Sequence, residues 1–442
     1  MSTDSGPGFR KAGLWSCAAL VAANMVGTGV FTSLGFQVAS LPSGFVIVLL
    51  WALGGVIALC GALSYAELAA ALPRSGGEYH FMSRIYHPAL GMAAGSVSVV
   101  VGFAAPIALA AMALGRYMEA AWPGIPGRVV AFAVVLGLAG VHAVAVGASA
   151  GFQVFSTFLK AGLISGFLFL GSRAGNASGI SFAPSAGDAA LLASPAFAVA
   201  LMYVIYSYSG WNAAAYIIDE VRNPSRTLPL ALCVATVAVM LAYVGLNALF
   251  LAAAPASEYA GRIEVAEIAA RALFGDSGGR AMAALIGLGL VASISAMTWA
   301  GPRVAQAAGR DYSVLRAMAA TSASGVPRRA LALQTALALV YLATGTFETV
   351  LVYSQFALVL CGVMTVLGVV VLRVREPGLA RPFRCPLFPL PPLLFVGIGL
   401  FALVHTALAR PSEAAAGLGV FLCGILLHRI IAKSATTPTP TG

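Results

Sequence analysis

The stretch Asn24-Met25-Val26-Gly27-Thr28-Gly29-Val30-Phe31 decides how the rest of this chain is interpreted. It lies inside the first apolar segment, residues 14–38, which is long enough to cross a bilayer. Gly27 and Gly29 stand near the middle of that segment. Irregular backbone at membrane depth is tolerated only where it is buried in protein or lines a cavity, because lipid cannot satisfy free N–H and C=O groups. The two glycines therefore indicate either a binding site or close packing of neighbouring helices.

The composition of the chain indicates a protein embedded in a lipid bilayer. Hydrophobic residues make up 60% of its 442 residues and charged residues only 9%, whereas a soluble domain carries about 25% charged residues. The formal net charge is +10, but the basic residues stand in the gaps between apolar segments. This pattern is typical of membrane topology signals and gives no indication of nucleic-acid binding.

The cysteines indicate neither a metal site nor a disulfide framework, because none forms a CxxC pair and most lie within apolar segments. We expect no metal, cofactor or catalytic residue in this chain. The cysteines are Cys17, Cys60, Cys233, Cys361, Cys385 and Cys423.

Twelve apolar segments qualify as membrane spans, since a helix needs about 20 apolar residues to cross the bilayer. The first follows Arg10 and Lys11 as the core of a signal peptide would, but eleven more follow it, so we interpret it as a retained span. The segment 258–274 differs, because its apolar residues alternate with charged ones such as Glu264 and Glu267. It predicts an amphipathic helix outside the bilayer. The predicted spans are residues 14–38, 44–71, 91–120, 127–147, 150–171, 195–218, 228–254, 280–305, 330–346, 349–373, 388–409 and 413–432.

Basic residues set the expected orientation. With the N-terminus in the cytoplasm, most lysines and arginines outside the spans fall on the cytoplasmic side, as the positive-inside rule requires. Both termini are then cytoplasmic in a multi-pass protein of the cell membrane. Residues 1–13 form an N-terminal tail, and residues 433–442 form a Thr- and Pro-rich disordered tail.

A second interrupted span occurs at Tyr206-Ser207-Tyr208-Ser209-Gly210-Trp211-Asn212. It is the sixth span, whereas the opening stretch belongs to the first. A pair of glycine-broken segments at matching positions in two halves is typical of an inverted-repeat transporter with a site near the bilayer midplane. We therefore expect a transport core over residues 14–373, with repeats 14–172 and 195–373, followed by helices 11 and 12 within 374–432.

A broken helix presents two ends of opposite polarity to a ligand. The outer half-helix begins with free N–H groups and a positive dipole end, which suit a carboxylate. The inner half-helix ends in free carbonyl groups, which suit an ammonium group. Two such helices that cross can hold both ends of a zwitterionic amino acid, with hydroxyl groups from Thr28 and Ser209 nearby.

Lys160 lies in the middle of the fifth predicted span, within Phe158-Leu159-Lys160-Ala161-Gly162. A snorkelling lysine is the simple interpretation, but snorkelling operates near the ends of a span. A fixed ammonium group at this depth can instead replace a coupling cation, bonding to freed carbonyls of the first span and to hydroxyls such as Ser293 or Ser295. Alternatively, the buried amine can exchange a proton.

Charged and aromatic residues near the breaks and span ends allow two interpretations each. Glu67 and the run Asp219-Glu220-Val221-Arg222 belong either to solvated helix ends or to ion pairs that order an inner gate or loop. Tyr206 and Trp211 flank the second break and are either packing aromatics or a gate over the site.

The charges within the spans limit the side chain of a substrate. Glu67 is an acid within a predicted span but lies near one end, while Lys160 is a base in the middle of a span and is committed elsewhere. Neither a cationic nor an acidic side chain has an obvious partner, so a neutral side chain fits best. Backbone groups can also solvate charge, which keeps cationic amino acids and polyamines as an alternative.

The run Gly147-Ala148-Ser149-Ala150-Gly151 matches the GxSxG pattern of serine hydrolases, and His142 is nearby. An intramembrane serine hydrolase that uses Ser149 is therefore a competing hypothesis. We do not favour it, because a chain this rich in Gly, Ala and Ser contains such matches by chance. This match also falls between two spans and not at a strand-to-helix elbow.

Three motifs resemble the amino acid–polyamine–organocation (APC) superfamily. The run Gly27-Thr28-Gly29-Val30-Phe31 is similar to its G-S/T-G-I-F element, and its second-span signature is similar to Tyr65-Ala66-Glu67-Leu68 with Leu72-Pro73-Arg74-Ser75-Gly76-Gly77-Glu78-Tyr79. The L-amino acid transporter (LAT) branch is especially similar at Tyr208-Ser209-Gly210-Trp211-Asn212, Asp219-Glu220-Val221-Arg222-Asn223-Pro224 and Leu228-Pro229-Leu230-Ala231. The resemblance covers most of the chain. It implies an all-α, LeuT-like membrane fold of twelve transmembrane helices, with five-plus-five inverted repeats, discontinuous helices 1 and 6, and two further helices.

The resemblance also implies how the site works. N–H groups around Thr28 and Gly29 would bind the substrate carboxylate, carbonyl groups of both breaks would bind its amino group, and Tyr206 would take the aromatic gate position. Lys160 would match the fifth-span lysine of sodium-independent members. The predicted substrate-binding set is Met25, Val26, Gly27, Thr28, Gly29, Tyr206, Ser207, Ser209 and Gly210, with Tyr206 and Trp211 as gate residues and Lys160, Ser293 and Ser295 in place of a coupling cation.

Two departures from the family pattern concern the substrate. Ser209 stands where LAT-like members often have glycine, and Tyr206 stands where phenylalanine is usual, so the size of the substrate is left open. Eukaryotic LAT proteins pair with a single-span glycoprotein, whereas the short loops and Ala richness of this chain favour a bacterial protein without one. We expect a sodium-independent transporter of small neutral L-amino acids, working by alternating access as an exchanger or a proton-coupled symporter, and not an enzyme.

Overall fold

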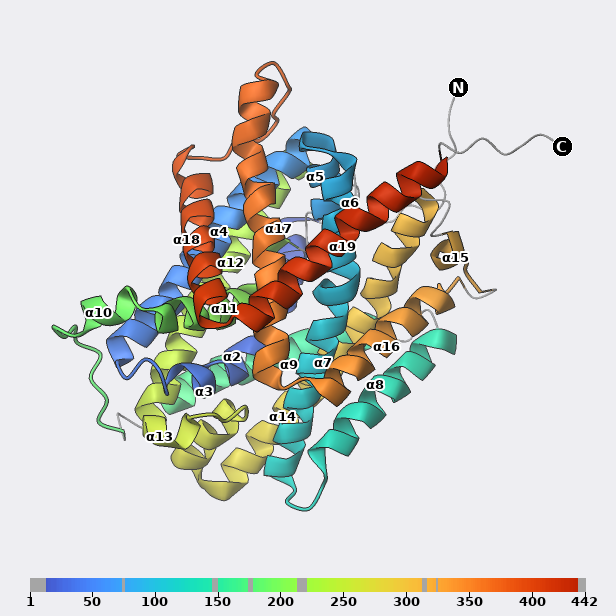
Figure 1. The fold of residues 1–442 in the computed structure, drawn as a ribbon. Helices are drawn as coiled ribbons and strands as arrows, with labels where there is room; N and C mark the ends of the chain where they lie inside the picture. Colours follow the sequence, from blue (N-terminus) through green and yellow to red (C-terminus); the bar gives the residue numbers. More distant parts are fainter. Residues whose placement is uncertain are drawn as a thin grey trace.

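The computed structural model describes residues 13–73, 76–144, 150–173, 178–212, 221–311, 316–322 and 325–435. Over these residues the regular secondary structure is helical, and no strand occurs among them (Figure 1). Residues 1–12 and 436–442 of the predicted tails, the acidic pair Asp219 and Glu220, and the hydrolase candidate Ser149 lie outside the described residues.

The helices follow the chain in the order that the apolar segments predict. The first half contains α1 (Leu14–Met25), α2 (Gly29–Thr32), α3 (Leu34–Gln37), α4 (Gly44–Ala71), α5 (Gly77–Ile85), α6 (Pro88–Val97), the π-helix η1 (Ser98–Phe103), α7 (Ala104–Ala121), α8 (Gly127–Val144) and α9 (Ala150–Gly171). The second half contains α10 (Asp188–Leu192), α11 (Pro195–Tyr208), α12 (Pro224–Ala253), α13 (Ala256–Tyr259), α14 (Val265–Asp311), α15 (Arg316–Ala319), α16 (Arg328–Thr344), α17 (Phe347–Arg375), α18 (Leu390–Ala409) and α19 (Pro411–Ala435).

Nine helical segments within the described residues are long and apolar enough to cross a membrane. They include α4, α12 and α17, whose bounds lie close to the predicted spans 44–71, 228–254 and 349–373. Helices α9, α11 and α16 also lie in predicted spans, but their described apolar stretches are shorter. An all-helical membrane protein is therefore confirmed, while the crossing of all twelve segments stays a prediction.

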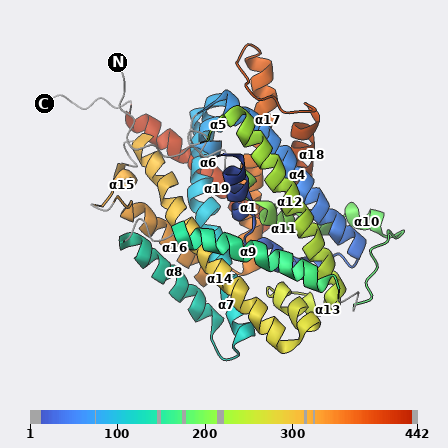
Figure 2. The same cartoon turned by 180° about the vertical axis from the view of Figure 1, so that it is seen from behind.

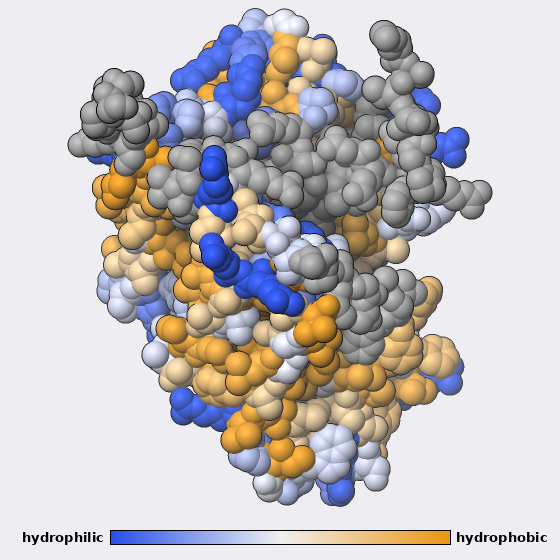
Figure 3. Space-filling view, turned by 90° about the vertical axis from the view of Figure 1, so that its right-hand side faces the viewer, coloured by the Kyte–Doolittle hydropathy of each residue, from blue (hydrophilic) through white to orange (hydrophobic). Residues whose placement is uncertain are grey.

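The outer surface has the character of a surface in contact with lipid. Apart from the residues drawn in grey, hydrophobic residues cover much of the left side and lower half of the face in Figure 3, and many hydrophilic residues lie toward its top. Large apolar side chains such as Val129, Phe158 and Leu241 are exposed on α8, α9 and α12. Contiguous apolar surface of this kind is rare on a soluble monomer and is expected on a protein whose solvent is the bilayer.

Several spans begin with capping residues that are evident in the sequence. The Ser43 hydroxyl accepts the N–H of Val46 at the start of α4, and the Ser194 hydroxyl accepts that of Phe197 at the start of α11. Pro195 follows Ser194 within the first turn of α11, where its missing N–H costs no helical hydrogen bond. These caps fix where the spans start and therefore which residues reach the middle of the bilayer.

The two predicted breaks are present in the structure. Helix α1 ends at Met25 and α2 begins at Gly29. Helix α11 ends at Tyr208, and Gly210 follows with a φ of +106°, a backbone conformation that favours glycine. Each break leaves helix-terminal N–H or carbonyl groups without partners in their own helix.

Helices from the two halves of the chain pack in matching pairs. Among the described residues, the most extensive helix contacts are those of α4 with α12 and of α7 with α14. Helix α8 packs on α7 as α16 packs on α14, and α1 packs on α12 as α11 packs on α4 (Figures 1 and 2). We call one side of the bundle, where α5 and the end of α17 lie, the α5 side, and the opposite side the α13 side.

The predicted amphipathic helix over 258–274 does not form as one element. Helix α13 covers only Ala256–Tyr259, and α14 begins at Val265, with non-helical backbone at Gly275. The prediction of a single amphipathic helix over this segment is therefore wrong, and its glutamates differ, because Glu264 and Glu267 are buried whereas Glu258 is exposed.

Arginines explain why Glu264 and Glu267 can be buried. Glu264 Oε1 accepts a hydrogen bond from Arg262 Nε at 2.7 Å and from Arg116 Nη2 at 3.3 Å. Glu267 forms an ion pair with Arg271 one turn along α14. A buried carboxylate is tolerated when it is paired and hydrogen-bonded, and Arg116 supplies a partner from α7 that the local sequence pattern does not reveal.

Candidate substrate site

The two broken spans cross at their glycines. A methyl group added to Gly29 would lie 2.4 Å from Ser207 Oγ and 2.5 Å from Ser207 Cα, so only glycine lets α2 approach α11 this closely. At the second break, a methyl group on Gly210 would lie 2.7 Å from the carbonyl oxygen of Asn24. Both glycines are therefore packing residues that bring the two breaks together.

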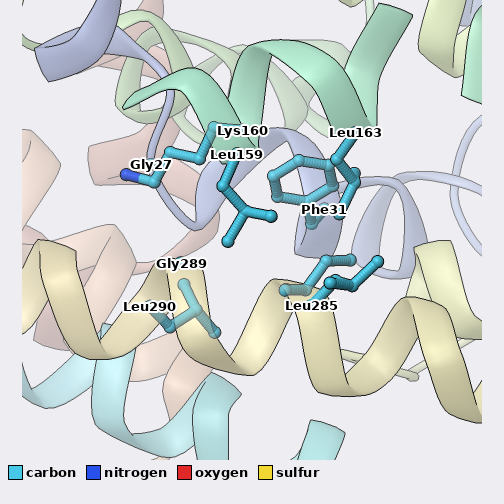
Figure 4. A pocket seen from close by; sticks show the side chains of 9 residues that line it. Gly27, Phe31, Leu159, Lys160, Leu163, Leu285, Gly289 and Leu290 are labelled. Carbon is cyan, nitrogen blue, oxygen red and sulfur yellow. The ribbon is translucent and has the colours of Figure 1, made fainter. Parts of the chain in front are cut away.

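Gly27 has a different environment. A methyl group at this position would approach only the carbonyl oxygen of Met25, at 4.0 Å. Gly27 also lines a small hollow between α9 and α14, together with Phe31 and Leu290 (Figure 4). Of the two interpretations that the sequence leaves open, packing therefore applies to Gly29, whereas Gly27 leaves room beside the break.

The backbone around the first break carries groups of both polarities. Helix α2 begins at Gly29, so the first N–H groups of this half-span have no acceptor within the helix. On the other side of the break, the Met25 carbonyl accepts the N–H of Gly27 at 2.8 Å and the Tyr243 hydroxyl at 2.7 Å. Sequence reasoning missed Tyr243, because a tyrosine inside an apolar span gives no periodic signal.

Lys160 reaches from α9 to the first break. Its Nζ donates to the Val26 carbonyl at 2.9 Å and to Ser293 Oγ at 2.7 Å. Figure 4 shows the side chain extending toward Gly27 at the edge of the hollow. One ammonium group thus joins α9, the end of α1 and α14, and it satisfies a carbonyl that the end of α1 sets free.

Ser295 takes a different partner. Its hydroxyl lies 2.9 Å from His142 Nε2 on α8, and both side chains are buried. Residues two positions apart on a helix do not share a face, so Ser293 and Ser295 point to different neighbours. Of the two serines predicted as partners of Lys160, only Ser293 contacts it in the structure. His142, considered above together with Ser149, contacts Ser295 on α14.

Tyr206 extends from α11 to the first break. Its hydroxyl lies 2.5 Å from Thr28 Oγ1, and both side chains are buried. This contact joins the two discontinuous spans through side chains, close to the backbone crossing at Gly29. The structure thus brings the predicted gate tyrosine directly to the predicted carboxylate site.

The serines of the second break bond mainly within α11. Ser207 Oγ donates to the Tyr203 carbonyl at 2.8 Å and lies 3.1 Å from Ser33 Oγ. Ser209 Oγ donates to the Ile205 carbonyl at 3.0 Å. Hydroxyls that bond to the preceding turn hold the end of α11 in shape, and Ser33 links that end to the first span.

Trp211 points to other neighbours. Its ring centroid lies 4.8 Å from that of Tyr65 on α4 and 6.2 Å from that of Phe395 on α18. A methyl group added to Gly61 would lie 2.8 Å from the Trp211 ring. Of the two predicted gate residues, Tyr206 contacts Thr28, whereas Trp211 packs the second break against α4 and α18.

Glu67 lies in a buried ion-pair cluster, and its interpretation as part of a solvated helix end is wrong. Arg373, near the end of α17, donates from Nε to Glu67 Oε1 at 2.8 Å and from Nη2 to Oε2 at 2.6 Å. The backbone N–H of Cys385 donates to the same Oε2 at 2.7 Å. The carboxylate thus holds α4 to α17 and to the connection before α18, whereas Arg222, the described charge of the other predicted pair, is exposed.

The half of the first span toward the α13 side is packed more tightly than α1. Phe36 stacks between Tyr203 and Phe347, with ring centroids 5.3 Å and 5.6 Å away. On α1, by contrast, Trp15 is 74% exposed and Asn24 is also exposed. The crossing of the breaks is therefore covered toward the α13 side and more accessible along α1.

Comparison with known proteins connects this site with a family. A family model described as amino acid permease matches residues 13–422. The serine/threonine exchanger SteT of Bacillus subtilis (strain 168) is 25% identical over 438 residues, which cover 97% of this chain and 98% of that protein.

Two mammalian proteins are similar to a comparable extent. The b(0,+)-type amino acid transporter 1 of Mus musculus is 26% identical over 416 residues, which cover 91% of this chain and 84% of that protein. The cystine/glutamate transporter of Homo sapiens is 26% identical over 426 residues, which cover 94% and 84% of the two chains. The match to the amino acid permease family model runs through both broken spans.

Proposed function

Because this chain belongs to the amino acid permease family, in the LAT branch of the APC superfamily, we propose that it is a sodium-independent transporter of neutral L-amino acids working by alternating access. The observation that carries the proposal is the contact of the Lys160 ammonium group with the Val26 carbonyl and Ser293. The Lys160 ammonium group occupies the junction of α1, α9 and α14, where we propose that it replaces a transported coupling cation.

The groups at the crossing suit the two charged ends of an amino acid. The N–H groups at Thr28 and Gly29 would bind the carboxylate, since unpaired N–H groups at the start of a half-helix favour an anion. Carbonyl groups at the two breaks would bind the ammonium group. The Met25 carbonyl is shared with Tyr243, so substrate binding there would compete with the tyrosine hydroxyl or add to it. Tyr206, which already touches Thr28, would act as the gate.

A neutral substrate side chain agrees with how the buried charges are used. Glu67 is bound by Arg373 and the Cys385 N–H, and the Lys160 amine is bound to the first break and α14. Neither charge is left to attract a charged side chain. The serine/threonine specificity in the name of the Bacillus subtilis relative supports small neutral substrates, whereas the cystine/glutamate relative shows that the family also accommodates others.

The conformation and the repeat architecture are part of the same proposal. With the predicted orientation, the α5 side is cytoplasmic, and the tight packing around Phe36 would represent a closed outer gate in an inward-facing state. The matching helix pairs support two inverted repeats over 14–172 and 195–373.

Uptake into proteoliposomes tests the proposal. Purified protein should take up labelled serine or threonine equally well with sodium or with choline outside, and other small neutral amino acids should compete. A strict sodium requirement would contradict the assigned role of Lys160. Strong competition by lysine or a polyamine, with weak competition by neutral amino acids, would instead favour the cationic substrates considered above.

The same proteoliposomes distinguish exchange from proton symport. Stimulation of uptake by unlabelled amino acid inside the vesicles supports exchange. Stimulation by an inward proton gradient, without internal amino acid, supports symport. Vesicles that contain unlabelled amino acid and are also exposed to an inward proton gradient show whether the two stimulations of uptake add.

A further inference from the structure

A hollow lies where the ends of α8 and α14 meet the start of α16. His142 on α8, Trp299 and Arg303 on α14, and Val326, Pro327 and Leu331 at the start of α16 line it. None of the residues that line this hollow lines the hollow beside Gly27 or belongs to either break. The transport proposal assigns no part to it.

Arg303 lines this hollow and Arg328 directly follows the lining residue Pro327, and neither has a carboxylate partner among the described residues. The Arg303 guanidinium lies over the Trp299 ring at 3.5 Å and donates to the Trp299 carbonyl. Arg328 Nε donates to the Ala143 carbonyl at 3.2 Å. By contrast, Arg373 pairs with the buried carboxylate of Glu67, and Arg84 and Arg410 pair with partly exposed carboxylates.

A guanidinium group that has no carboxylate partner and lies beside a hollow favours binding of an anion. The residues around the hollow indicate which chemical class of anion would bind. Trp299 is 40% exposed on α14, and Val141 and Val144 are exposed near the end of α8. Exposed tryptophan next to arginine is the pattern of a membrane interface, where lipid chains meet their headgroups.

We infer that the junction of α8, α14 and α16 binds the phosphate group of an anionic membrane lipid. Arg303 and Arg328 would donate hydrogen bonds to the phosphate oxygens, because the guanidinium fork matches phosphate geometry and the phosphate would supply the missing counter-charge. The acyl chains would lie along Trp299, Val141 and Val144. Such a lipid would bridge three helix ends, including that of α14, which carries the serine bound to Lys160.

Fluorescence quenching by brominated lipids tests this inference on the full-length protein. The protein is placed in phosphatidylcholine nanodiscs that contain a minor share of brominated phosphatidylglycerol or, in parallel, brominated phosphatidylcholine. The Trp299→Phe variant isolates the contribution of Trp299 by difference. We expect brominated phosphatidylglycerol to quench Trp299 at lower concentration than brominated phosphatidylcholine does. The apparent affinity should be up to about 30-fold higher, which is the factor that two arginines near an anionic lipid would give.

Substitutions then locate the preference. Arg303→Gln with Arg328→Gln should abolish it, and each single change should lower it roughly fivefold. Arg128→Gln is the matched control, because Arg128 also donates to a helix-end carbonyl in the α8–α16 pair, that of Ala343 at the opposite end. A preference that persists in the double variant would overturn the inference.

Two further outcomes keep the inference testable. If inorganic phosphate in solution displaces the brominated phosphatidylglycerol, the site binds soluble anions and the lipid assignment is wrong. If the double variant does not fold, the comparison of the two brominated lipids on the wild-type protein still tests the inference. Equal quenching of Trp299 by both lipids would overturn it.

Discussion

Arg128 and Arg328 make the same contact at opposite ends of one helix pair. Arg128, at the start of α8, donates to the carbonyl of Ala343 near the end of α16 at 3.1 Å. Arg328, at the start of α16, donates to the carbonyl of Ala143 near the end of α8 at 3.2 Å. An antiparallel pair with exchanged contacts is what two inverted repeats would produce at equivalent helices. The finding supports the repeat architecture from side chains that no sequence motif contains.

The exchanged contacts predict which side of the membrane each arginine faces. In a cysteine-free background, Arg128→Cys should react with a membrane-impermeant maleimide added to intact cells, because the predicted orientation places the start of α8 outside. Arg328→Cys should react only after the membrane is permeabilised. Labelling of Arg328→Cys in intact cells, with protection of Arg128→Cys, would reverse the orientation and place both termini outside.

Lys160→Ala should reduce transport to background. The substitution removes two hydrogen bonds of a charged group, each worth about 1.5–3 kcal/mol, and leaves the Val26 carbonyl unpaired at membrane depth. Ser293→Ala should lower the initial rate of uptake roughly tenfold, since it removes one of the two bonds. Initial rates in proteoliposomes are the measurement.

Ser295→Ala is the control for that experiment. It removes the same chemical group two residues along α14, where the partner is His142. If Ser293→Ala and Ser295→Ala impair uptake equally, the lysine contact has no special role. Near wild-type uptake by Lys160→Ala would return the residue to a snorkelling or structural role.

Gly29→Ala and Gly27→Ala should differ in stability. A methyl group at Gly29 collides with the Ser207 backbone, and overpacking of this kind costs about 1–3 kcal/mol. A methyl group at Gly27 meets no atom closer than 4.0 Å. Thermal unfolding in detergent should therefore show a lower Tm for Gly29→Ala only.

Uptake by the Gly27→Ala variant then tests the site. The variant should stay folded but raise the KM, because the methyl group would occupy space next to the proposed carboxylate groups. Wild-type kinetics in folded Gly27→Ala protein would place the substrate elsewhere.

Glu67→Gln should destabilise the protein strongly. It leaves the Arg373 guanidinium without its counter-charge in a buried cluster, a change that costs about 3–5 kcal/mol. Glu376→Gln is the matched control, because it breaks an Arg–Glu pair at the same end of α17 that is exposed and therefore contributes little. Comparable Tm shifts for the two variants would show that the Glu67 cluster is not a stabilising contact.

Lowering the pH should remove the stabilisation that the exposed Arg84–Glu376 ion pair contributes. The hydrogen bonds from Arg84 hold the pKa of Glu376 below its ordinary value. A lowered carboxyl pKa stabilises the fold above the ordinary pKa, and this contribution is lost as the pH falls through the lowered value. The Tm difference between wild type and Glu376→Gln should shrink as the pH falls below the ordinary glutamate pKa of about 4.3 and approach zero once the pH is below the lowered pKa of Glu376. A difference that grows on acidification would contradict this sign.

The sequence predicted more about the first span than about its partners. The break, the depth of Lys160 and the polarity of the half-helix ends follow from hydropathy and from the two glycines. Tyr243 and Arg373 were not identified as partners, because nothing in the local pattern marks which residues of the seventh and tenth spans face Met25 or Glu67.

At the charged segment 258–274 the sequence pattern led to a wrong prediction. Alternating apolar and charged residues predicted a polar face in water, but Arg116 from α7 lies against Glu264 and turns that face inward. Periodicity reports that two faces differ, and it does not report what covers the polar one.

The sequence by itself indicated that this chain is embedded in a bilayer, which segments are apolar enough to span it, where two of these segments are broken, and which family the chain belongs to. These properties depend on local composition and on motifs that are contiguous along the chain. The tertiary structure alone decided that Gly29 packs while Gly27 leaves space, that Ser293 and not Ser295 binds Lys160, and that Tyr206 and not Trp211 meets Thr28. Such choices depend on how each helix is rotated and where it crosses its neighbour, and residues far apart in sequence set both.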